Sequence, residues 1–407
     1  MSLISYKKNI DFADIELPSS KSIYNRVLIL KHLYNLNLNI KNKSESDDGL
    51  LLEKLIISNK LILNCQNAGT VIRFLTAYIA AKGNRKILTG SKRMKQRPIE
   101  ELIDALNTIG ADISYRNNNG YPPVVINKSN LFSKTINFNG SKSSQFLSAL
   151  IMIGAKLKNG LIINIGKKPK SKPYIDMTVK LMKLIGFNLD ADDKKIEIKE
   201  FQNTKTINEI EIEADWSAAA FWFEIVLFSK SISVLLKKLK IESLQGDAII
   251  AKLSEDFGLK TTKKNNGILI EKDNKPPKNN TEYDFSNYPD LAPVVIVMLA
   301  ASKLKAKIKG IETLKLKESD RSLALQNELK KCNVIFKENE EYWILDATKF
   351  KLKKGTSFKN YKDHRIAMAL APLACFEDIK MKTGDVCSKS YPHFWEDLQK
   401  AGFEIKD

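Results

Sequence analysis

Two kinds of predicted helix alternate along the chain, and they differ in where their apolar residues lie. In the first kind, a polar turn leads into a segment that is apolar nearly all round; residues 291–301, for example, contain no charged side chain. A helix of this kind is buried on every side, and about eleven residues cannot cross a bilayer, which takes about 20. Such segments follow the turn at 17–26 and begin again at Asn67, Ser141, Asp215, Pro289 and Asp363.

The second kind of helix is amphipathic and follows the first kind each time. Short alternating runs between the helices, such as Ile196/Ile198 and Ile268/Ile270, predict strands. After the first gap the pattern recurs at roughly 75 residues, which is too long for a solenoid repeat and predicts a larger supersecondary block. The sequence thus predicts an α/β (α+β) fold of six βαβα-plus-strand blocks, three in each half. The amphipathic helices are expected at 48–57, 98–109, 174–185, 247–257, 320–332 and 392–401.

The apolar helices also predict where a ligand binds. Three of them in each half are expected to form a core enclosed by sheets with polar outer faces. If they pack in parallel, their N-termini, which carry partial positive charge, reach one surface. Two such halves facing each other would direct six helix N-termini at one interdomain cleft. That arrangement suits a substrate with several negative charges.

The first polar turn, Leu17–Arg26, contains the residues of an anion site. Its serines can cap a helix whose first backbone N–H groups are free, and Lys21 adds an ammonium at the same end. Arg26 is close enough along the helix to join them. An ordinary capped helix with two solvated cations is the alternative.

The net charge of +19 raises the possibility of nucleic-acid binding. Only eight of the 66 basic residues are arginine, however, and the lysines are spread over the whole chain, which is typical of a solvated surface. The arginines are placed differently, because five of the eight lie at or near predicted helix starts. Arginine differs from lysine in offering a planar fork to a carboxylate or phosphate. These five are Arg26, Arg73, Arg97, Arg321 and Arg365.

Length and cysteine usage narrow the class further. A chain of 407 residues fits two domains of about 200 residues. Four scattered cysteines and three dispersed histidines do not form a zinc pattern. No secretory leader or membrane span is expected, so the sequence predicts a cytoplasmic protein with reduced thiols.

Ten short segments together resemble one family, the 3-phosphoshikimate 1-carboxyvinyltransferases, or EPSP synthases, which are enolpyruvyl transferases. The segments occur in the family's order from Pro18 to Pro392 and are jointly very specific. They are residues 17–26 (LPSSKSIYNR), 67–73 (NAGTVIR), 88–99 (LTGSKRMKQRPI), 121–123 (YPP), 143–147 (SSQFL), 171–176 (SKPYID), 289–290 (PD), 317–321 (KESDR), 363–368 (DHRIAM) and 389–392 (KSYP).

The resemblance implies both the fold and the reaction. It implies two similar domains of three βαβαββ units each, which would comprise residues 16–212 and residues 1–15 with 213–407. It implies transfer of the enolpyruvyl group of phosphoenolpyruvate to the 5-hydroxyl of shikimate 3-phosphate, with release of phosphate, in aromatic amino acid biosynthesis. No cofactor, metal, nucleic acid or membrane is implied, and a monomer is expected.

The resemblance also implies roles for individual residues. The expected contacts of shikimate 3-phosphate are Lys21, Ser22, Arg26, Ser143, Ser144, Gln145, Ser171, Asp290 and Lys317. The expected contacts of phosphoenolpyruvate are Lys21, Gly69, Arg97, Gln145, Arg321, Arg365 and Lys389. Asp290 is the expected base for the hydroxyl, and Glu318 and Lys21 are candidates for proton transfer at the methylene carbon.

Some residues depart from the family pattern. Ser19 replaces a glycine, Phe74 replaces a proline found in many members, and Thr313 replaces an asparagine that touches the substrate. The stretch from Asp47 to Cys65 is short for the family. None of these changes removes a charged residue of the expected site.

Three alternatives remain open. UDP-N-acetylglucosamine enolpyruvyl transferase shares the fold and chemistry, but its family carries a reactive cysteine in the loop that corresponds to 91–96, where this chain has none. RNA 3′-phosphate cyclase has related repeats but centres its chemistry on a late histidine. A non-catalytic RNA-binding protein would show salt-dependent RNA retention without enolpyruvyl transfer.

Overall fold

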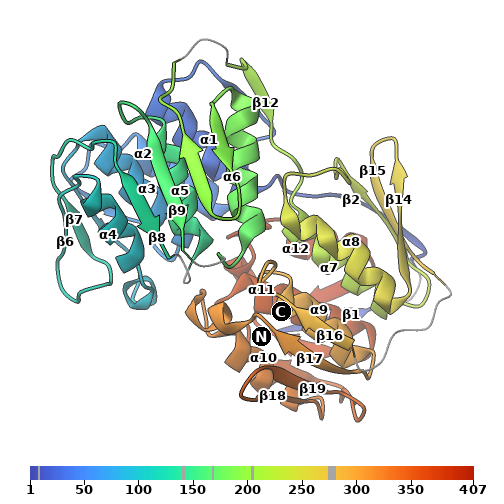
Figure 1. Cartoon of the computed structure of the whole chain (residues 1–407). Helices are drawn as coiled ribbons and strands as arrows, with labels where there is room; N and C mark the ends of the chain where they lie inside the picture. The colour runs from blue at the N-terminus through green and yellow to red at the C-terminus, as the bar shows by residue number, and fades with distance from the viewer. Residues whose placement is uncertain (8–9, 140–142, 167–168, 203–205, 274–280) are drawn as a thin grey trace. The chain divides into compact units, whose positions relative to one another are not determined.

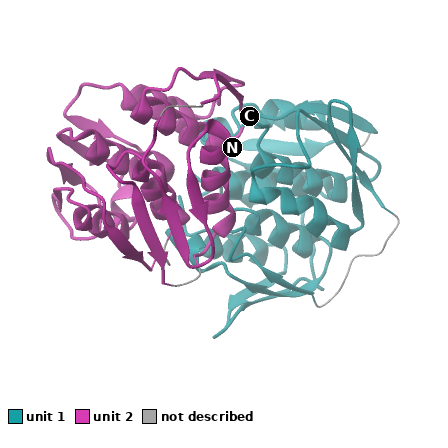
Figure 2. Cartoon of the chain, turned by 45° about the horizontal axis from the view of Figure 1, so that its top comes forward, with its two compact units in different colours: residues 1–19, 213–407 teal, residues 20–212 magenta. Residues whose placement is uncertain are grey.

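The computed structural model describes residues 1–407 except 8–9, 140–142, 167–168, 203–205 and 274–280 (Figure 1). The predicted helix start at Ser141 lies outside the described residues. The chain divides into two compact units, residues 1–19 with 213–407 (unit 1) and residues 20–212 (unit 2) (Figure 2). Both units are mixed α/β, as predicted.

In the described part of unit 2 there are two four-stranded sheets and one two-stranded sheet. The sheet orders are β4-β5-β7-β6, β8-β9-β11-β10 and β12-β3. The strands are β3 (Asn39–Lys41), β4 (Ile62–Asn64), β5 (Lys86–Thr89), β6 (Ile113–Tyr115), β7 (Val124–Ile126), β8 (Thr135–Phe138), β9 (Leu161–Ile165), β10 (Leu189–Ala191), β11 (Lys195–Ile198) and β12 (Glu209–Glu211). The helices are α1 (Lys21–Tyr34), α2 (Asp47–Ile56), α3 (Gly69–Lys82), α4 (Glu100–Thr108), α5 (Ser144–Gly154) and α6 (Lys172–Ile185).

The described residues of unit 1 form three four-stranded sheets, with the orders β2-β13-β15-β14, β16-β17-β19-β18 and β20-β21-β1-β22. Its strands are β1 (Ser2–Tyr6), β2 (Phe12–Glu16), β13 (Ser233–Lys237), β14 (Leu259–Lys264), β15 (Gly267–Lys272), β16 (Thr281–Asp284), β17 (Lys305–Lys309), β18 (Ile335–Glu338), β19 (Trp343–Asp346), β20 (Thr356–Phe358), β21 (Ile379–Met381) and β22 (Phe403–Lys406). Its helices are α7 (Trp216–Phe228), α8 (Ile250–Leu253), α9 (Ala292–Ala301), α10 (Arg321–Lys330), α11 (His364–Leu370) and α12 (Phe394–Lys400).

The five four-stranded sheets share one plan. In each, the first two strands in sheet order pair in parallel and the remaining pairs are antiparallel. A parallel pair needs a crossover, and a buried helix supplies it in the blocks of β4, β8 and β16, for example α3 between β4 and β5. This repetition agrees with the predicted βαβαββ unit.

One block is smaller than predicted. The block of α1 and α2 has only the parallel pair β12 and β3 among its described residues, without the antiparallel hairpin of the other five. The short stretch from Asp47 to Cys65 explains the difference, because α2 and the turn into β4 occupy nearly all of it. The predicted helix at 247–257 also differs, since it is divided into three short helical turns, 246–249, α8 and 254–257.

Strand pairing, rather than chain order, decides which unit a segment joins. β2 precedes α1 in the chain but pairs with β13 of unit 1 as far as Glu16 and Lys237. β12 precedes α7 but pairs with β3 of unit 2. Residues 16–19 therefore group with unit 1, whereas the sequence placed them at the start of the 16–212 domain.

The apolar helices form the cores, as their composition predicts. Every residue of α9 is buried, and in unit 2 the helices α1, α3 and α5 pack against one another. No helix of the described chain has the length and apolar character that a membrane crossing requires. The four cysteines, all within described segments, are unpaired and buried.

Glu224 is a buried acidic residue in the apolar core of unit 1. It lies in α7, it is 0 % exposed, and neither carboxyl oxygen has a hydrogen-bond partner. Burial raises its pKa well above the ordinary value, so the group is protonated in the folded protein over a wider pH range than in the unfolded chain. Its contribution to stability is therefore largest in acid, below the unfolded pKa of about 4.3, and is lost as pH rises above it.

Replacement of Glu224 by leucine is expected to increase the free energy of unfolding at pH 7 by about 1–3 kcal/mol, because an unpaired buried polar group is removed. Urea denaturation followed by tryptophan fluorescence reports on unit 1, since all four tryptophans lie in residues 213–407. Glu224→Gln is the control, because it removes the titration but keeps a polar group. A leucine variant less stable than wild type at pH 8 would contradict the prediction.

Candidate active site

In unit 2, most predicted site residues lie at helix starts, whereas Arg26 is in the second turn of α1 and Arg97 is in the loop before α4. Lys21 is the first residue of α1, and its Nζ lies 3.2 Å from Oδ2 of Asp48 in the first turn of α2. The Lys21 side chain is only 13 % exposed, so this ion pair is largely shielded from solvent. Ser22 follows it in the same turn, and its backbone carbonyl accepts a hydrogen bond from Arg26 Nη1 at 2.7 Å.

The Arg26 guanidinium is occupied by protein partners. It is 2 % exposed. Its Nε donates to Thr178 Oγ1 at 2.7 Å, and its Nη2 donates to Ser148 Oγ and the Tyr174 carbonyl, each at 3.2 Å. Burial lowers its pKa to about 10, so it remains charged near neutrality. Arg26 thus joins α1 to α5 and α6, and any ligand contact must share these donors.

Three residues around Gly69 form a second group in unit 2. Arg73 Nη1 donates to Gln145 Oε1 at 2.8 Å, and its Nη2 donates to the Pro98 carbonyl at 3.1 Å. Gln145 Nε2 in turn donates to Thr70 Oγ1 at 3.1 Å, which links the first turns of α3 and α5. A Cβ atom on Gly69 would lie 2.7 Å from both Arg73 Nη1 and Arg97 Nη2. The absence of a Cβ atom therefore lets the two guanidinium groups come close to the helix start, and a larger residue would have to displace them.

The predicted serines lie at the starts of α5 and α6. Ser143 caps α5 by accepting a hydrogen bond from the Gln145 N–H at 3.3 Å, and Ser144 begins that helix. Ser171 precedes α6 with φ 58° and ψ 40°, a left-handed conformation that is uncommon for serine. Such strain is often found at functional sites, where the surrounding structure maintains it.

In unit 1, three cations surround the Asp290 carboxylate. Oδ1 lies 3.2 Å from Lys317 Nζ and 3.1 Å from Arg321 Nη1, and Oδ2 lies 3.1 Å from Arg365 Nη2. Burial alone would raise the pKa of Asp290, but Arg365, Lys317 and Arg321 together hold it well below its ordinary value. Burial lowers the pKa of Lys317.

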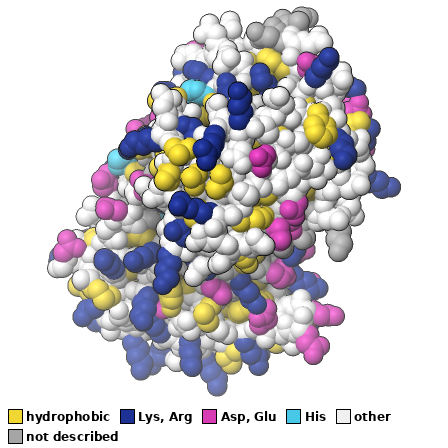
Figure 3. Space-filling view, turned by 90° about the vertical axis from the view of Figure 1, so that its left-hand side faces the viewer, with side chains coloured by type: hydrophobic (Ala, Val, Ile, Leu, Met, Phe, Trp, Pro, Cys, Tyr) yellow, Lys and Arg dark blue, Asp and Glu magenta, His cyan; other side chains and the backbone are white. Residues whose placement is uncertain are grey.

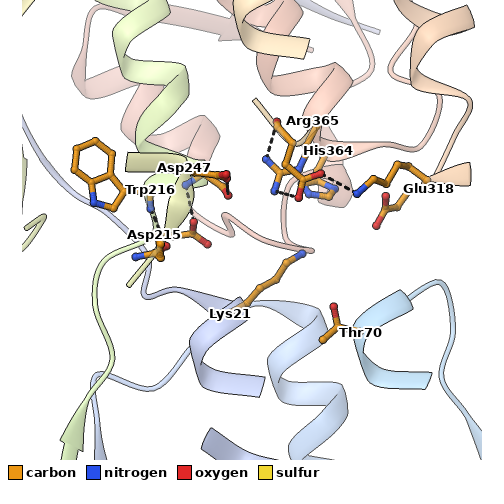
Figure 4. Close-up of polar contacts among 12 residues, drawn as sticks. Lys21, Thr70, Asp215, Trp216, Asp247, Glu318, His364 and Arg365 are labelled. Carbon is orange, nitrogen blue, oxygen red and sulfur yellow. Dashed lines mark hydrogen bonds and ion pairs between the residues drawn. The ribbon is translucent and has the colours of Figure 1, made fainter. Parts of the chain in front are cut away.

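Arg321 connects this group to two further carboxylates. Its Nε and Nη2 donate to the two oxygens of Asp363 at 2.9 and 3.2 Å, and Nη2 also contacts Glu318 Oε2 at 2.8 Å. Burial would lower the pKa of Arg321, but Asp363, Glu318 and Asp290 raise it above its ordinary value. Glu318 Oε1 lies 3.1 Å from Lys389 Nζ, so an unbroken chain of ion pairs runs from Arg365 through Asp290, Arg321 and Glu318 to Lys389. Arg365 and Glu318 of this group are labelled in Figure 4.

In unit 2 the structure joins Lys21 to Asp48 and, separately, joins Gln145 to Arg73 and Thr70 at the start of α3. In unit 1 it brings together Asp290, Lys317, Glu318, Arg321, Arg365 and Lys389. Among the described residues, no group of three or more His, Cys, Asp and Glu side chains is arranged to hold a metal ion.

A comparison with known protein families identifies the family to which this chain is related. The pattern of the family described as EPSP synthase (3-phosphoshikimate 1-carboxyvinyltransferase) matches residues 15–398. The chain belongs to the EPSP synthase family. The 3-phosphoshikimate 1-carboxyvinyltransferase of Bacteroides fragilis is 37 % identical over 396 residues, which cover 97 % of this chain and 96 % of that protein. The enzyme of the same name from Haemophilus influenzae is 31 % identical, covering 95 % of each chain.

Solved structures carry the same EPSP synthase fold. The EPSP synthase from Acinetobacter baumannii superimposes with a TM-score of 0.76 at 18 % identity, covering both chains completely. The enolpyruvyl transferase NikO from Streptomyces tendae gives the same TM-score at 12 % identity, covering 100 % of this chain and 98 % of that one. These similarities confirm the predicted fold.

Three acidic residues of this EPSP synthase family member were not predicted as part of the site. Asp48 and Asp363 are the counter-ions of Lys21 and Arg321. Asp247 accepts a hydrogen bond from Ser217 in the first turn of α7. Asp48 and Asp363 lie at predicted helix starts, so the sequence predicts their place in the helix. It does not predict their ion-pair partners, because these come from other helices.

Proposed function

We propose that this protein transfers the enolpyruvyl group of phosphoenolpyruvate to the 5-hydroxyl of shikimate 3-phosphate, with release of phosphate. The observation that carries the proposal is the grouping of Lys317, Arg321 and Arg365 around Asp290. It provides a carboxylate for the hydroxyl proton and cations for the charge that develops on the other substrate. Family membership over residues 15–398 supports the same reaction.

The binding roles follow from the charges in each unit. In unit 2, Lys21, Ser22, Arg26, Ser143, Ser144, Gln145 and Ser171 are proposed to bind shikimate 3-phosphate, with Asp290 and Lys317 from unit 1. Lys21, Gly69, Arg97, Gln145, Arg321, Arg365 and Lys389 are proposed to bind phosphoenolpyruvate. Because Arg26 already has four protein contacts, we propose that it acts mainly by fixing Ser22 and the start of α6.

Asp290 is proposed as the base. Its three cation partners make it a weak base in the arrangement described here, because they favour the ionised carboxylate. When Arg321 and Arg365 bind the anionic groups of phosphoenolpyruvate, their ion pairs with Asp290 weaken. Its pKa then rises, and it can accept the proton of the 5-hydroxyl as the hydroxyl oxygen attacks C2 of phosphoenolpyruvate.

Two groups are proposed for proton transfer at the methylene carbon. Lys21 carries a proton that it can give to this carbon during the addition. Glu318 is held by Arg321 and Lys389 at 2.8 and 3.1 Å, so it becomes available only when these cations turn to the substrate. In the elimination, the proton leaves the same carbon as the C–O bond to phosphate breaks.

The protein is proposed to act as a cytoplasmic monomer of two domains, without a nucleic-acid or membrane partner. On the face shown in Figure 3, Lys and Arg side chains are scattered among Asp and Glu, which supports a solvated surface over a nucleic-acid groove.

One assay tests the proposed function. Phosphate release from phosphoenolpyruvate is measured with and without shikimate 3-phosphate, and release is expected only when both are present. UDP-N-acetylglucosamine in place of shikimate 3-phosphate is the specificity control. Phosphate release with that sugar nucleotide alone would assign the protein to the other reaction of this fold.

Replacement of Gly69 by alanine is expected to raise the KM for phosphoenolpyruvate by about tenfold or more, because the new methyl group displaces the Arg73 and Arg97 guanidinium groups. The KM for shikimate 3-phosphate should change less. Steady-state kinetics with each substrate varied in turn provides the measurement. Unchanged values for both substrates would mean that the two arginines move aside without loss of binding.

A further inference from the structure

Glu328 is a buried carboxylate that the proposed function leaves without a role. It lies in α10 and is 1 % exposed. Its Oε1 accepts a hydrogen bond from the Tyr361 hydroxyl at 2.8 Å, and its Oε2 accepts one from the Lys359 backbone N–H at 3.0 Å. Lys331 adds an ion pair to Oε2 at 2.5 Å. A carboxylate so far removed from water needs such partners, and two of the three belong to residues 359–361.

Residues 360–363 form a tight turn whose backbone conformation is unfavourable. The Asp363 N–H donates to the Asn360 carbonyl at 2.9 Å, which closes the turn. Both central residues are left-handed, Tyr361 with φ 55° and Lys362 with φ 54°. Positive φ at both positions is the pattern of a type I′ turn, which favours glycine, asparagine and aspartate, and it is an outlier for bulky side chains. The turn therefore costs free energy that contacts with the surrounding structure must offset.

Side chains on both sides of the turn supply these contacts. Asn360 Nδ2 donates to the Lys382 carbonyl at 2.7 Å, and Asn360 Oδ1 accepts a hydrogen bond from the Lys362 N–H at 3.0 Å. Burial and the adjacent Glu328 carboxylate raise the pKa of Tyr361 to about 12, so the hydroxyl keeps its proton and acts as the donor to Glu328. Glu328 thus fixes the first left-handed residue to α10.

The turn leads directly into the candidate active site. Asp363, its last residue, binds Arg321 Nε and Nη2 at 2.9 and 3.2 Å, and it caps α11 by accepting a hydrogen bond from the Arg365 N–H at 3.0 Å. Arg321 and Glu328 are seven residues apart in α10, so they lie on the same face of the helix. One face of α10 therefore holds residues 359–363 at two points, and the position of Arg365 follows from both.

We propose that Glu328 is a positioning residue, which fixes Arg365 for its anionic ligand by stabilising the strained turn at 360–363. The inference rests on the proposed function in taking phosphoenolpyruvate as that ligand. Without the Glu328 carboxylate the turn relaxes toward a less strained conformation, and ligand binding must form it again. The affinity for the anion is reduced by the free energy of that step. Asp290 is not held by the turn, so kcat depends on Glu328 much less.

Replacement of Glu328 by glutamine tests this dependence, because the amide keeps the size of the side chain but has a single acceptor oxygen and no charge. The KM for phosphoenolpyruvate should rise about tenfold, as for the loss of a hydrogen bond to a charged group. The KM for shikimate 3-phosphate and kcat should change much less. Steady-state phosphate release by the full chain provides the measurement. Tyr361→Phe removes only the hydroxyl and should raise the same KM about threefold, which tests the inference even if Glu328→Gln folds poorly.

A rescue experiment separates positioning from a merely structural role. Glycine adopts positive φ without the strain that lysine has, so Lys362→Gly should make the turn less dependent on Glu328. Combined with Glu328→Gln, it should recover most of the lost affinity for phosphoenolpyruvate. Lys303→Gly is the matched control, because Lys303 is another exposed lysine of unit 1 with φ 58°, and it should give no recovery. A merely structural role of Glu328 predicts lower stability without any such recovery.

Inorganic phosphate provides a measurement that does not depend on turnover. Titrated into the full chain by calorimetry, it should bind more weakly to Glu328→Gln than to wild type, and Lys362→Gly should restore its affinity. If wild type shows no enolpyruvyl transfer, the proposed function fails, and these phosphate affinities still support or overturn the role of Glu328.

Two results would overturn the inference. The first is an equal KM for phosphoenolpyruvate, or an equal phosphate affinity where there is no turnover, in wild type, Glu328→Gln and Tyr361→Phe. The second is recovery by Lys303→Gly as large as that by Lys362→Gly, because the strained turn would then have no specific part in binding.

Discussion

Replacement of Asp290 by asparagine is expected to reduce kcat by a factor of about 10²–10⁴, the usual loss when a general base is removed. The amide keeps the shape of the side chain but cannot accept the hydroxyl proton. It also leaves Lys317, Arg321 and Arg365 without their shared counter-ion. These cations are then more available to ligand anions, so the KM for phosphoenolpyruvate should stay the same or fall.

The measurement is steady-state phosphate release with both substrates at saturation and then with each varied. Asp385→Asn, at an exposed position of the same unit, is the control and should retain wild-type kinetics. Turnover like that of wild type in Asp290→Asn would move the base to another residue, with Glu318 the first candidate. A large rise in both KM values with unchanged kcat would make Asp290 a binding residue only.

Lysine at Arg97, Arg321 or Arg365 is expected to raise the KM for phosphoenolpyruvate by an amount equivalent to about 1.5–3 kcal/mol, the value of a hydrogen bond to a charged group. Lysine keeps the charge but loses the planar fork that binds a carboxylate or phosphate through two parallel bonds. The KM for shikimate 3-phosphate should change much less, because its proposed contacts lie mainly in unit 2.

Arg321 is expected to differ from the other two. Its guanidinium contacts Asp290, Glu318 and Asp363 at once, and a lysine ammonium cannot span the three carboxylates. Arg321→Lys should therefore also lower the stability of unit 1, measured by urea denaturation followed through tryptophan fluorescence. Arg365→Lys, which loses the two hydrogen bonds that Arg365 Nη1 and Nη2 donate to Asp290, should lower it less.

Arg26→Lys should mainly affect shikimate 3-phosphate, because it weakens the support of Ser22 and the start of α6. Arg85→Lys and Arg116→Lys, at exposed positions, are the controls and should have no effect. Equal losses for both substrates in Arg97→Lys, Arg321→Lys and Arg365→Lys would mean that only net charge matters at these positions.

The periodicity of apolar residues predicts the helices well, because burial alone decides the composition of a segment such as α9. It also predicts which charged residues lie at helix starts. It does not predict the ion-pair partners of these residues. Asp290, Arg321 and Arg365 lie at the starts of three different helices, and their contacts depend on packing between segments up to 75 residues apart. Arg26 is the clearest case, since its sequence context predicts a ligand contact and its donors point to Thr178, Ser148 and Tyr174.

Strand pairing was the least predictable feature. The alternating pattern of β2 identifies a strand but contains no information on whether β3 or β13 is its neighbour. That choice depends on long-range contacts, which short-range periodicity does not record. The missing hairpin after α2, in contrast, follows from the length of the chain between Asp47 and Cys65.

The pairing of the first two strands has a consequence for the order in which the protein can form during synthesis. β1 and β2 leave the ribosome first, yet their sheet partners are β13, β21 and β22. Unit 2 can complete all its described strand pairs once residue 211 has emerged. β1 and β2 therefore lack these strand partners while unit 2 folds. The sheet that contains β1 is complete only after residues 403–406, which form β22, have left the ribosome.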